Sequence, residues 1–121
     1  DLKLAQEITA QMREKPILAC GIFNLKQFGA LCKRLDLFIS ADTGPLHIAN
    51  AVKTKKIIAL FGPTSPAITG PFPDKDVIIL QKSAGCKIPC YLVGCKDNRC
   101  MKEITPDEVF EQIRLLKVKG G

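Results

Sequence analysis

The sequence predicts an α/β domain in which helices flank a parallel β-sheet. Three uninterrupted apolar runs, at residues 37–40, 57–61 and 77–80, have the composition of strands that are covered on both faces. Segments with a helical spacing of apolar residues alternate with these runs, as in parallel sheets with right-handed crossovers. A length of 121 residues, 46% of them hydrophobic and 25% charged, suits one soluble core and leaves little room for a second domain.

The chain begins with a predicted helix and a predicted strand. Leu4, Ile8 and Met12 recur every four residues and place one apolar stripe on a helix that should end near Glu14, just before a proline. The Ile-Leu-Ala-Cys run at residues 17–20 indicates a short strand, which would be a fourth member of the sheet. Because the chain starts inside a helix and lacks an initiator Met, we expect a fragment of a longer protein.

Two further helices are predicted before and after the strand at residues 37–40. Asn24 can cap the first of them, Gln27 can complete a capping box, and the helix should end near Arg34. The side chains expected to be buried on this helix are Leu25, Phe28, Leu31 and Leu35. The next helix is predicted from Gly44 to about Val52.

The C-terminal part combines a loop-rich stretch, a strand and a closing helix. Residues 62–73 are rich in Gly and Pro, so only a short turn of helix from residues 65–66 fits there. Thr105 should cap the last helix, with a proline at its first position and Glu108 completing a capping box. The stripe expected to be buried on this helix is Val109, Phe110, Ile113 and Leu116, and Gly120 and Gly121 should end it.

The loop at residues 40–47 is the first candidate ligand site, since ligands of open parallel sheets bind beyond the carboxyl ends of the strands. Gly44 lets the backbone approach a ligand, and the following helix N-terminus favours phosphate. Asp42 can accept from sugar hydroxyls, the Thr43 hydroxyl can add a hydrogen bond, and His47 can donate to a phosphate oxygen. The alternative is that Asp42 and Thr43 only cap the helix and that His47 is an ordinary first-turn residue.

The loop at residues 61–67 is the second candidate ligand site. It follows the next buried strand, so its tip should lie beside the first loop at the same edge of the sheet. Gly62 and Thr64 suit contact with a phosphate or a sugar. As an isolated pattern, however, a Gly-Pro turn is also an ordinary loop.

Charge and cysteines concentrate in one segment of the C-terminal part. The chain has 18 Lys+Arg against 12 Asp+Glu, a net charge of +6, and the segment 82–102 is locally basic. The basic side chains there are Lys82, Lys87, Lys96, Arg99 and Lys102, which fit either a polyanionic partner or a solvated surface. Cys20 and Cys32 lie in apolar stretches and are expected to pack in the core.

Four more cysteines, Cys86, Cys90, Cys95 and Cys100, lie close together in sequence and could hold a structural Zn²⁺ with four thiolates. Their spacing is looser than that of paired C-x-x-C knuckles. Four reduced thiols are the alternative, as are disulfides, which a cytosolic protein would not be expected to form.

Four motifs carry a resemblance to a known family. They are residues 42–47 (Asp-Thr-Gly-Pro-Leu-His), residues 59–66 (Ala-Leu-Phe-Gly-Pro-Thr-Ser-Pro), residues 69–71 (Thr-Gly-Pro), and Cys100-Met101 with residues 104–106 (Ile-Thr-Pro). Through these motifs, and over nearly its whole length, the chain resembles the bacterial lipopolysaccharide heptosyltransferases. These form glycosyltransferase family 9, whose members use ADP-heptose and similar donors. The resemblance implies the GT-B architecture, in which two Rossmann-like domains face a cleft. This chain is similar to the C-terminal half, a single nucleotide-sugar-binding domain over residues 1–121 without the N-terminal acceptor domain and the opening strand.

The resemblance also implies which residues bind the donor. Those at the diphosphate and sugar are Asp42, Thr43, Gly44 and His47, with the backbone of Pro45 and Leu46 beside them; Gly62 and Thr64 belong to the second loop, and Phe23 and Asn24 lie near the adenine. No catalytic residue is expected here, because the general base belongs to the missing domain. No cofactor is required for transfer, since a helix N-terminus, backbone amides and an imidazole can stabilise the leaving diphosphate.

We therefore expect the donor-binding domain of an inverting glycosyltransferase of lipopolysaccharide core biosynthesis, inactive by itself. Its partners would be the nucleotide-sugar donor and, through the missing domain, a lipopolysaccharide core or lipid A precursor acceptor, with no nucleic acid. The expected location is the cytoplasm, at the inner face of the bacterial inner membrane. The alternative is a non-catalytic, zinc-containing nucleic-acid or regulatory binding module, although 6% aromatic residues and no Trp offer few stacking platforms for bases.

Overall fold

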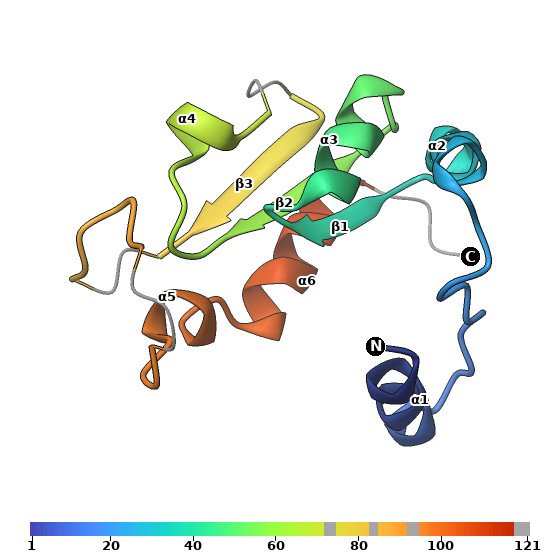
Figure 1. Cartoon of the computed structure of the whole chain (residues 1–121), viewed down its shortest axis with the longest axis horizontal. Coiled ribbons are helices and arrows are strands. Elements are labelled where there is room, and N and C mark those ends of the chain that lie inside the picture. Colours follow the sequence, from blue (N-terminus) through green and yellow to red (C-terminus); the bar gives the residue numbers. More distant parts are fainter. Residues whose placement is uncertain (72–74, 83–84, 92–94, 118–121) are drawn as a thin grey trace.

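Three parallel strands form the sheet at the centre of the molecule (Figure 1). The computed structural model describes residues 1–71, 75–82, 85–91 and 95–117. The strands are β1 (Phe38–Ala41), β2 (Ile57–Phe61) and β3 (Val77–Gln81), in the order β1-β2-β3. Ala41 is in register with Leu60, and Leu60 with Leu80, so the carboxyl ends of the three strands lie together at one edge. The predicted α/β class with a parallel sheet is confirmed.

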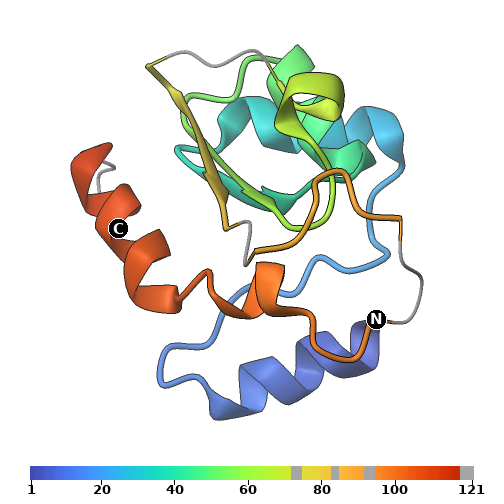
Figure 2. The ribbon, with the colours of Figure 1, turned by 90° about the vertical axis from the view of Figure 1, so that its left-hand side faces the viewer.

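Helices lie on both sides of this sheet (Figures 1 and 2). They are α1 (Leu2–Gln11), α2 (Leu25–Arg34), α3 (Gly44–Ala51), α4 (Pro66–Thr69), α5 (Arg99–Lys102) and α6 (Pro106–Leu115). Helix α3 packs on β1, β2 and α2, while α5 packs on β2. In Figure 1, α2, α3 and α4 lie on one side of the sheet, and α5 and α6 lie on the other. Because helices cover both faces of the central strand β2, its side chains are apolar at every position.

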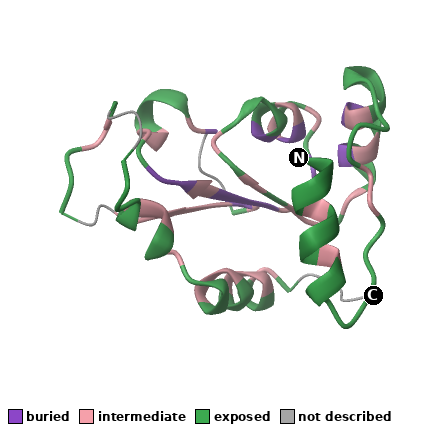
Figure 3. Cartoon of the chain, turned by 60° about the horizontal axis from the view of Figure 1, so that its bottom comes forward, coloured by how far each residue is buried: buried purple, intermediate pink, exposed green. Residues whose placement is uncertain are grey.

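The core lies between β2 and α3 (Figure 3). Its buried apolar side chains are Cys32, Leu46, Ala49, Ile57, Ala59, Phe61 and Val77. Ile58 is also fully buried but does not belong to this cluster. At its margin, Phe28 and Phe38 meet edge to face, with ring centroids 6.0 Å apart. Thr54 is the buried polar residue of the described chain, and its hydroxyl donates to the Cys32 carbonyl over 3.0 Å, so its burial leaves no unpaired donor.

The N-terminal cap of α2 forms as predicted. The Gln27 N–H donates to Asn24 Oδ1 over 2.9 Å, and the Asn24 N–H donates to Gln27 Oε1 over 3.0 Å, which completes a capping box. In α6, Thr105 Oγ1 accepts from the Glu108 N–H over 3.2 Å, but the second bond of the predicted box does not form. The Glu108 carboxylate instead pairs with Lys82, 2.9 Å away, since this cation at the end of β3 is a stronger partner than a backbone N–H.

The predicted strand at residues 17–20 is wrong, because this segment is not part of the sheet. A strand needs a neighbour to pair its backbone groups, and the described sheet ends at β1. Ile17 is 96% exposed and Cys20 is exposed as well, so the expected burial of Cys20 is also wrong.

Helix α1 ends at Gln11, before the predicted Glu14. The Lys15 ammonium donates to the carbonyls of Thr9 and Met12, which satisfies acceptors at the helix end. The predicted apolar stripe of Leu4, Ile8 and Met12 is exposed. Leu25 of α2 and Phe110 of α6, both expected to be buried, are also exposed, and Leu25 lines a pocket that opens between α2 and α3. Helix α6 ends at Leu115, and Gly120 and Gly121 lie outside the described residues.

Candidate functional site at the carboxyl edge of the sheet

The two predicted loops meet at the carboxyl edge of the sheet. Asp42, which follows β1, accepts a hydrogen bond at Oδ2 from the hydroxyl of Thr69, the last residue of α4, over 2.8 Å. These two residues are 27 positions apart in sequence, so the bond joins the loop after β1 to the segment after β2. The predicted proximity of the two loops is therefore confirmed.

Asp42 and His47 face each other within the first loop. His47 Nε2 lies 3.6 Å from Asp42 Oδ1, and the two form an ion pair whenever the imidazole is protonated. The Asp42 side chain is 12% exposed, whereas that of His47 is 49% exposed. A partly buried carboxylate thus sits behind an imidazole that remains open to a ligand.

Thr43 stands at the N-cap position of α3 without capping it through its side chain. Its hydroxyl lies 3.3 Å from Ser40 Oγ and 3.4 Å from the Ala41 carbonyl, to which it donates. The Asp42 carboxylate is engaged by Thr69 and faces His47. The interpretation that Asp42 and Thr43 serve only as helix caps is therefore wrong.

The remaining residues of the first loop divide between core and surface. A Cβ added to Gly44 would meet no atom within 4 Å, so the space above this glycine is open. Pro45 is exposed at the start of α3. The Leu46 side chain is fully buried, and its N–H already donates to the Thr43 carbonyl over 3.1 Å, which makes Leu46 an anchor of the helix in the core.

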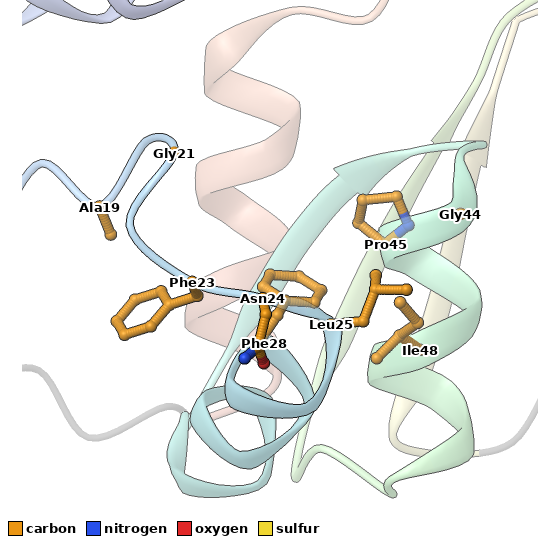
Figure 4. Close-up of a pocket in the computed structure, with 9 residues that line it drawn as sticks. All are labelled: Ala19, Gly21, Phe23, Asn24, Leu25, Phe28, Gly44, Pro45 and Ile48. Carbon is orange, nitrogen blue, oxygen red and sulfur yellow. The ribbon is translucent and has the colours of Figure 1, made fainter.

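A pocket of about 470 Å³ opens between the start of α2 and the start of α3 (Figure 4). It is lined by Ala19, Gly21, Phe23, Asn24, Leu25, Phe28, Gly44, Pro45 and Ile48. Two groups of residues predicted separately, Phe23 with Asn24 and Gly44 with Pro45, thus line one cavity. Its volume lies in the range of small-molecule sites, and its mostly apolar wall suits a flat ring system. The Asn24 side-chain oxygen is already used as the helix cap.

The second loop is held mainly by packing and by one side chain of β3. A Cβ on Gly62 would lie 2.7 Å from Met101 Sδ, so the Met101 side chain of α5 would have to shift to admit any other residue here. Gln81 Nε2 donates to the carbonyls of Gly62 and Thr64, over 3.1 and 2.8 Å. Sequence reasoning assigned no role to Gln81 or to Thr69. Gln81 could have been noticed in the sequence, because it is a polar residue that follows an apolar run and therefore lies at the same edge of the sheet.

The cysteine-rich segment packs against this second loop. The Cys90 N–H donates to the Pro63 carbonyl over 2.8 Å, and Cys100 Sγ lies 3.5 Å from the place of a Cβ on Gly62. Cys95 Sγ accepts from the Asn98 N–H over 3.4 Å. Within the described ranges, no three His, Cys, Asp or Glu side chains are arranged to hold a metal ion, and no cysteine is in a disulfide. Zinc binding by this segment therefore stays a prediction.

Ion pairs reduce the charge of the basic segment. Lys82 pairs with Glu108, and Arg99 pairs with Asp97. The hydrogen bond from Lys82 lowers the pKa of Glu108 from its ordinary value, and the hydrogen bond to Asp97 raises the pKa of Arg99. The apolar length that a membrane-crossing helix needs is not reached by any helix in the described part of the chain.

The fold and the site define a Rossmann-like α/β domain whose candidate ligand site lies where two strands lead into helices. The profile of glycosyltransferase family 9 (heptosyltransferase) matches residues 1–96, and the chain belongs to this family. The resemblance and the fold class expected from the sequence are thereby confirmed.

Similar proteins are known from several bacteria. Lipooligosaccharide heptosyltransferase 2 of Campylobacter jejuni subsp. jejuni serotype O:6 is 33% identical over 119 residues, which cover 94% of this chain and 37% of that protein. Lipopolysaccharide core heptosyltransferase OpsX of Haemophilus influenzae is 31% identical, with 96% of this chain and 35% of that protein covered. The crystal structure of the glycosyl transferase family 9 from Veillonella parvula DSM 2008 superposes with a TM-score of 0.78 at 28% identity and covers 96% of this chain and 33% of that chain. The chain thus spans about one third of the length of these relatives.

Proposed function

We propose that this chain is the donor-binding domain of an inverting heptosyltransferase of lipopolysaccharide core biosynthesis. Its ligand would be ADP-heptose or a related nucleotide sugar, bound at the carboxyl edge of the sheet. The observation that carries the proposal is the pocket between α2 and α3, whose lining includes Gly44 and Pro45 of the same loop that carries the facing Asp42 and His47. The family membership and the names of the relatives supply the substrate class.

The pocket suits the nucleoside end of such a donor. Phe23 and Phe28 offer aromatic faces on which a purine can stack, and Ile48 adds an apolar wall. Gly44 and Pro45 form the side of the pocket that leads to α3, and the open space above Gly44 leaves room for a phosphate. The base would therefore lie near α2 and the diphosphate near the start of α3.

The diphosphate would be held by groups that favour negative charge. The N-terminus of α3 carries the positive end of the helix dipole. The half-exposed His47 imidazole can donate to a phosphate oxygen, and the Thr43 hydroxyl can do so in exchange for its 3.4 Å bond to the Ala41 carbonyl. These groups stabilise a leaving diphosphate through hydrogen bonds and fixed dipoles, so diphosphate binding of this kind requires no cofactor.

Asp42 would bind a hydroxyl of the sugar, because a carboxylate accepts hydrogen bonds and repels phosphate. The general base and the acceptor site would belong to a second domain, in keeping with relatives about three times as long. The acceptor would then be a lipopolysaccharide core or lipid A precursor at the inner face of the inner membrane. The alternative of a zinc-containing nucleic-acid module has no support in the family match.

Calorimetric titration with ADP-heptose and with ADP tests the proposal. Asp42→Ala and His47→Ala should each weaken ADP-heptose binding about tenfold or more, as expected for hydrogen bonds that involve charged groups. Asp36→Ala is the matched control, because this exposed carboxylate pairs with Lys55 outside the pocket. Equal affinities of all three variants and the unmodified chain would overturn the proposal, as would a lack of binding at millimolar ligand.

A further inference from the structure

Asp42 divides its two carboxylate oxygens between two parts of the site. Oδ2 accepts from the Thr69 hydroxyl over 2.8 Å, and Oδ1 lies 3.6 Å from His47 Nε2. With a side chain that is 12% exposed, this carboxylate has little water to satisfy it. Its orientation therefore depends on the two protein groups that it faces.

The Thr69 hydroxyl has two acceptors within reach and one proton to give. The Asp42 carboxylate lies at 2.8 Å and the Ser65 carbonyl at 3.1 Å. Hydrogen bonds to a charged acceptor are the stronger ones, so the carboxylate takes the proton. The bond to Ser65 is the ordinary back-bond of a helical Thr, which Thr9 also makes, to Ala5 in α1.

A carboxylate without such a donor turns easily about its terminal torsion, which has broad minima. The bond from Thr69 fixes the plane of the group, and this plane decides which oxygen faces His47. Because Thr69 ends α4, the bond also ties the segment after β2 to the loop after β1. One hydroxyl thus holds both the carboxylate and the relative position of the two loops.

We propose that Thr69 is a positioning residue of the donor site, which orients Asp42 and, through Asp42, the imidazole of His47. This inference rests on the proposed function insofar as Asp42 and His47 bind the donor. Thr69 itself does not need to touch the ligand. Its loss lets the Asp42 carboxylate rotate, which misplaces the acceptor for the sugar hydroxyl and removes the fixed partner of the imidazole.

The test compares Thr69→Val, which removes the hydroxyl at nearly constant volume, with Thr69→Ser, which keeps it. Thr9→Val is the matched control, since it removes a helical Thr hydroxyl that has no carboxylate partner. The first readout is the ¹H–¹⁵N NMR signal of the imidazole in the free chain, which needs no assignment because the sequence contains 1 His. The second readout is the dissociation constant for ADP-heptose.

Thr69→Val should shift the His47 signals and weaken ADP-heptose binding about fivefold, the effect of one hydrogen bond. Thr69→Ser should restore both, and Thr9→Val should change neither. If Thr69→Val does not give a dispersed amide spectrum, Thr69→Ala removes the same hydroxyl without adding volume. His47 signals and affinity that match the unmodified chain in the folded variant would overturn the proposal.

The two readouts separate this proposal from the proposed function. His47 signals that shift in Thr69→Val and return in Thr69→Ser support the positioning role even if no variant binds ADP-heptose. In that case the proposed function fails and the link between Thr69 and His47 stands. ADP-heptose binding by the unmodified chain, with equal affinity and unchanged His47 signals in Thr69→Val, supports the function and rejects the positioning role.

Discussion

Two glycines of the candidate site should respond to alanine in opposite ways. A Cβ on Gly62 would lie 2.7 Å from Met101 Sδ and 3.0 Å from Met101 Cγ, about 1 Å inside the optimal separation of nonbonded carbon atoms. Overpacking of this kind costs about 1–3 kcal/mol. Gly62→Ala should therefore lower the free energy of unfolding by that amount, which corresponds to a fall in melting temperature of about 4–12 °C for a domain of this size.

Gly44→Ala should leave the fold intact, because no atom lies within 4 Å of the added Cβ. Its free energy of unfolding should be unchanged or raised by up to about 1 kcal/mol, since alanine reduces the entropy of the unfolded chain. Its affinity for ADP should fall, because the methyl group occupies the space that we assign to the diphosphate.

Urea unfolding and calorimetric titration of the two variants measure both effects. Met101→Ala added to Gly62→Ala removes the clashing atoms, so the cost of the Gly62 change should be smaller in that background. A stable Gly62→Ala variant with weakened ADP binding would refute the packing role of Gly62. An unchanged affinity in Gly44→Ala would refute the location of the diphosphate.

Two further predictions concern the segment around α6 and the cysteines. Because Lys82 holds the pKa of Glu108 below its ordinary value of 4.5, Glu108 stabilises the fold above about pH 4.5, and this contribution is lost as the pH falls through the lower pKa of the folded chain. Glu108→Gln should thus be less stable than the unmodified chain in urea at neutral pH and should lose less stability on acidification; an identical pH profile would contradict this. If the cysteine-rich segment binds zinc, elemental analysis of protein purified without chelator should find stoichiometric zinc. The metal should be lost in Cys100→Ser and kept in Cys20→Ser. Metal-free unmodified protein would show the zinc prediction to be wrong.

The central elements of the fold could be predicted because their signals are local. The run at residues 57–61 is apolar at every position, and β2 has these same bounds. The capping box of Asn24 and Gln27 involves atoms three residues apart, so sequence spacing was enough to find it. The run at residues 17–20 shows the limit, because an apolar segment becomes a strand only where a neighbouring strand pairs with it.

The placement of the two candidate loops at one edge of the sheet could be predicted, but their internal contacts could not. The carboxyl-edge rule for parallel sheets placed the loops of Asp42 and Gly62 together from strand order alone. The bond between Thr69 and Asp42 joins residues far apart in sequence, and no periodicity or spacing encodes it. Gly62 was predicted to contact a ligand, and the structure shows that it also lies against Met101. Sequence alone did not indicate this packing contact.

Chemical-shift mapping with ADP on the ¹⁵N-labelled chain would show whether a nucleotide binds at the carboxyl edge of the sheet. We predict saturable amide shifts that include Phe23 and Asn24 at the pocket, Gly44 at the start of α3 and His47 in its first turn. The amides around Asp76, at the opposite end of the sheet, should not move. Shifts confined to that opposite end, or none at millimolar ADP, would contradict the assignment of the carboxyl edge as a nucleotide-sugar site.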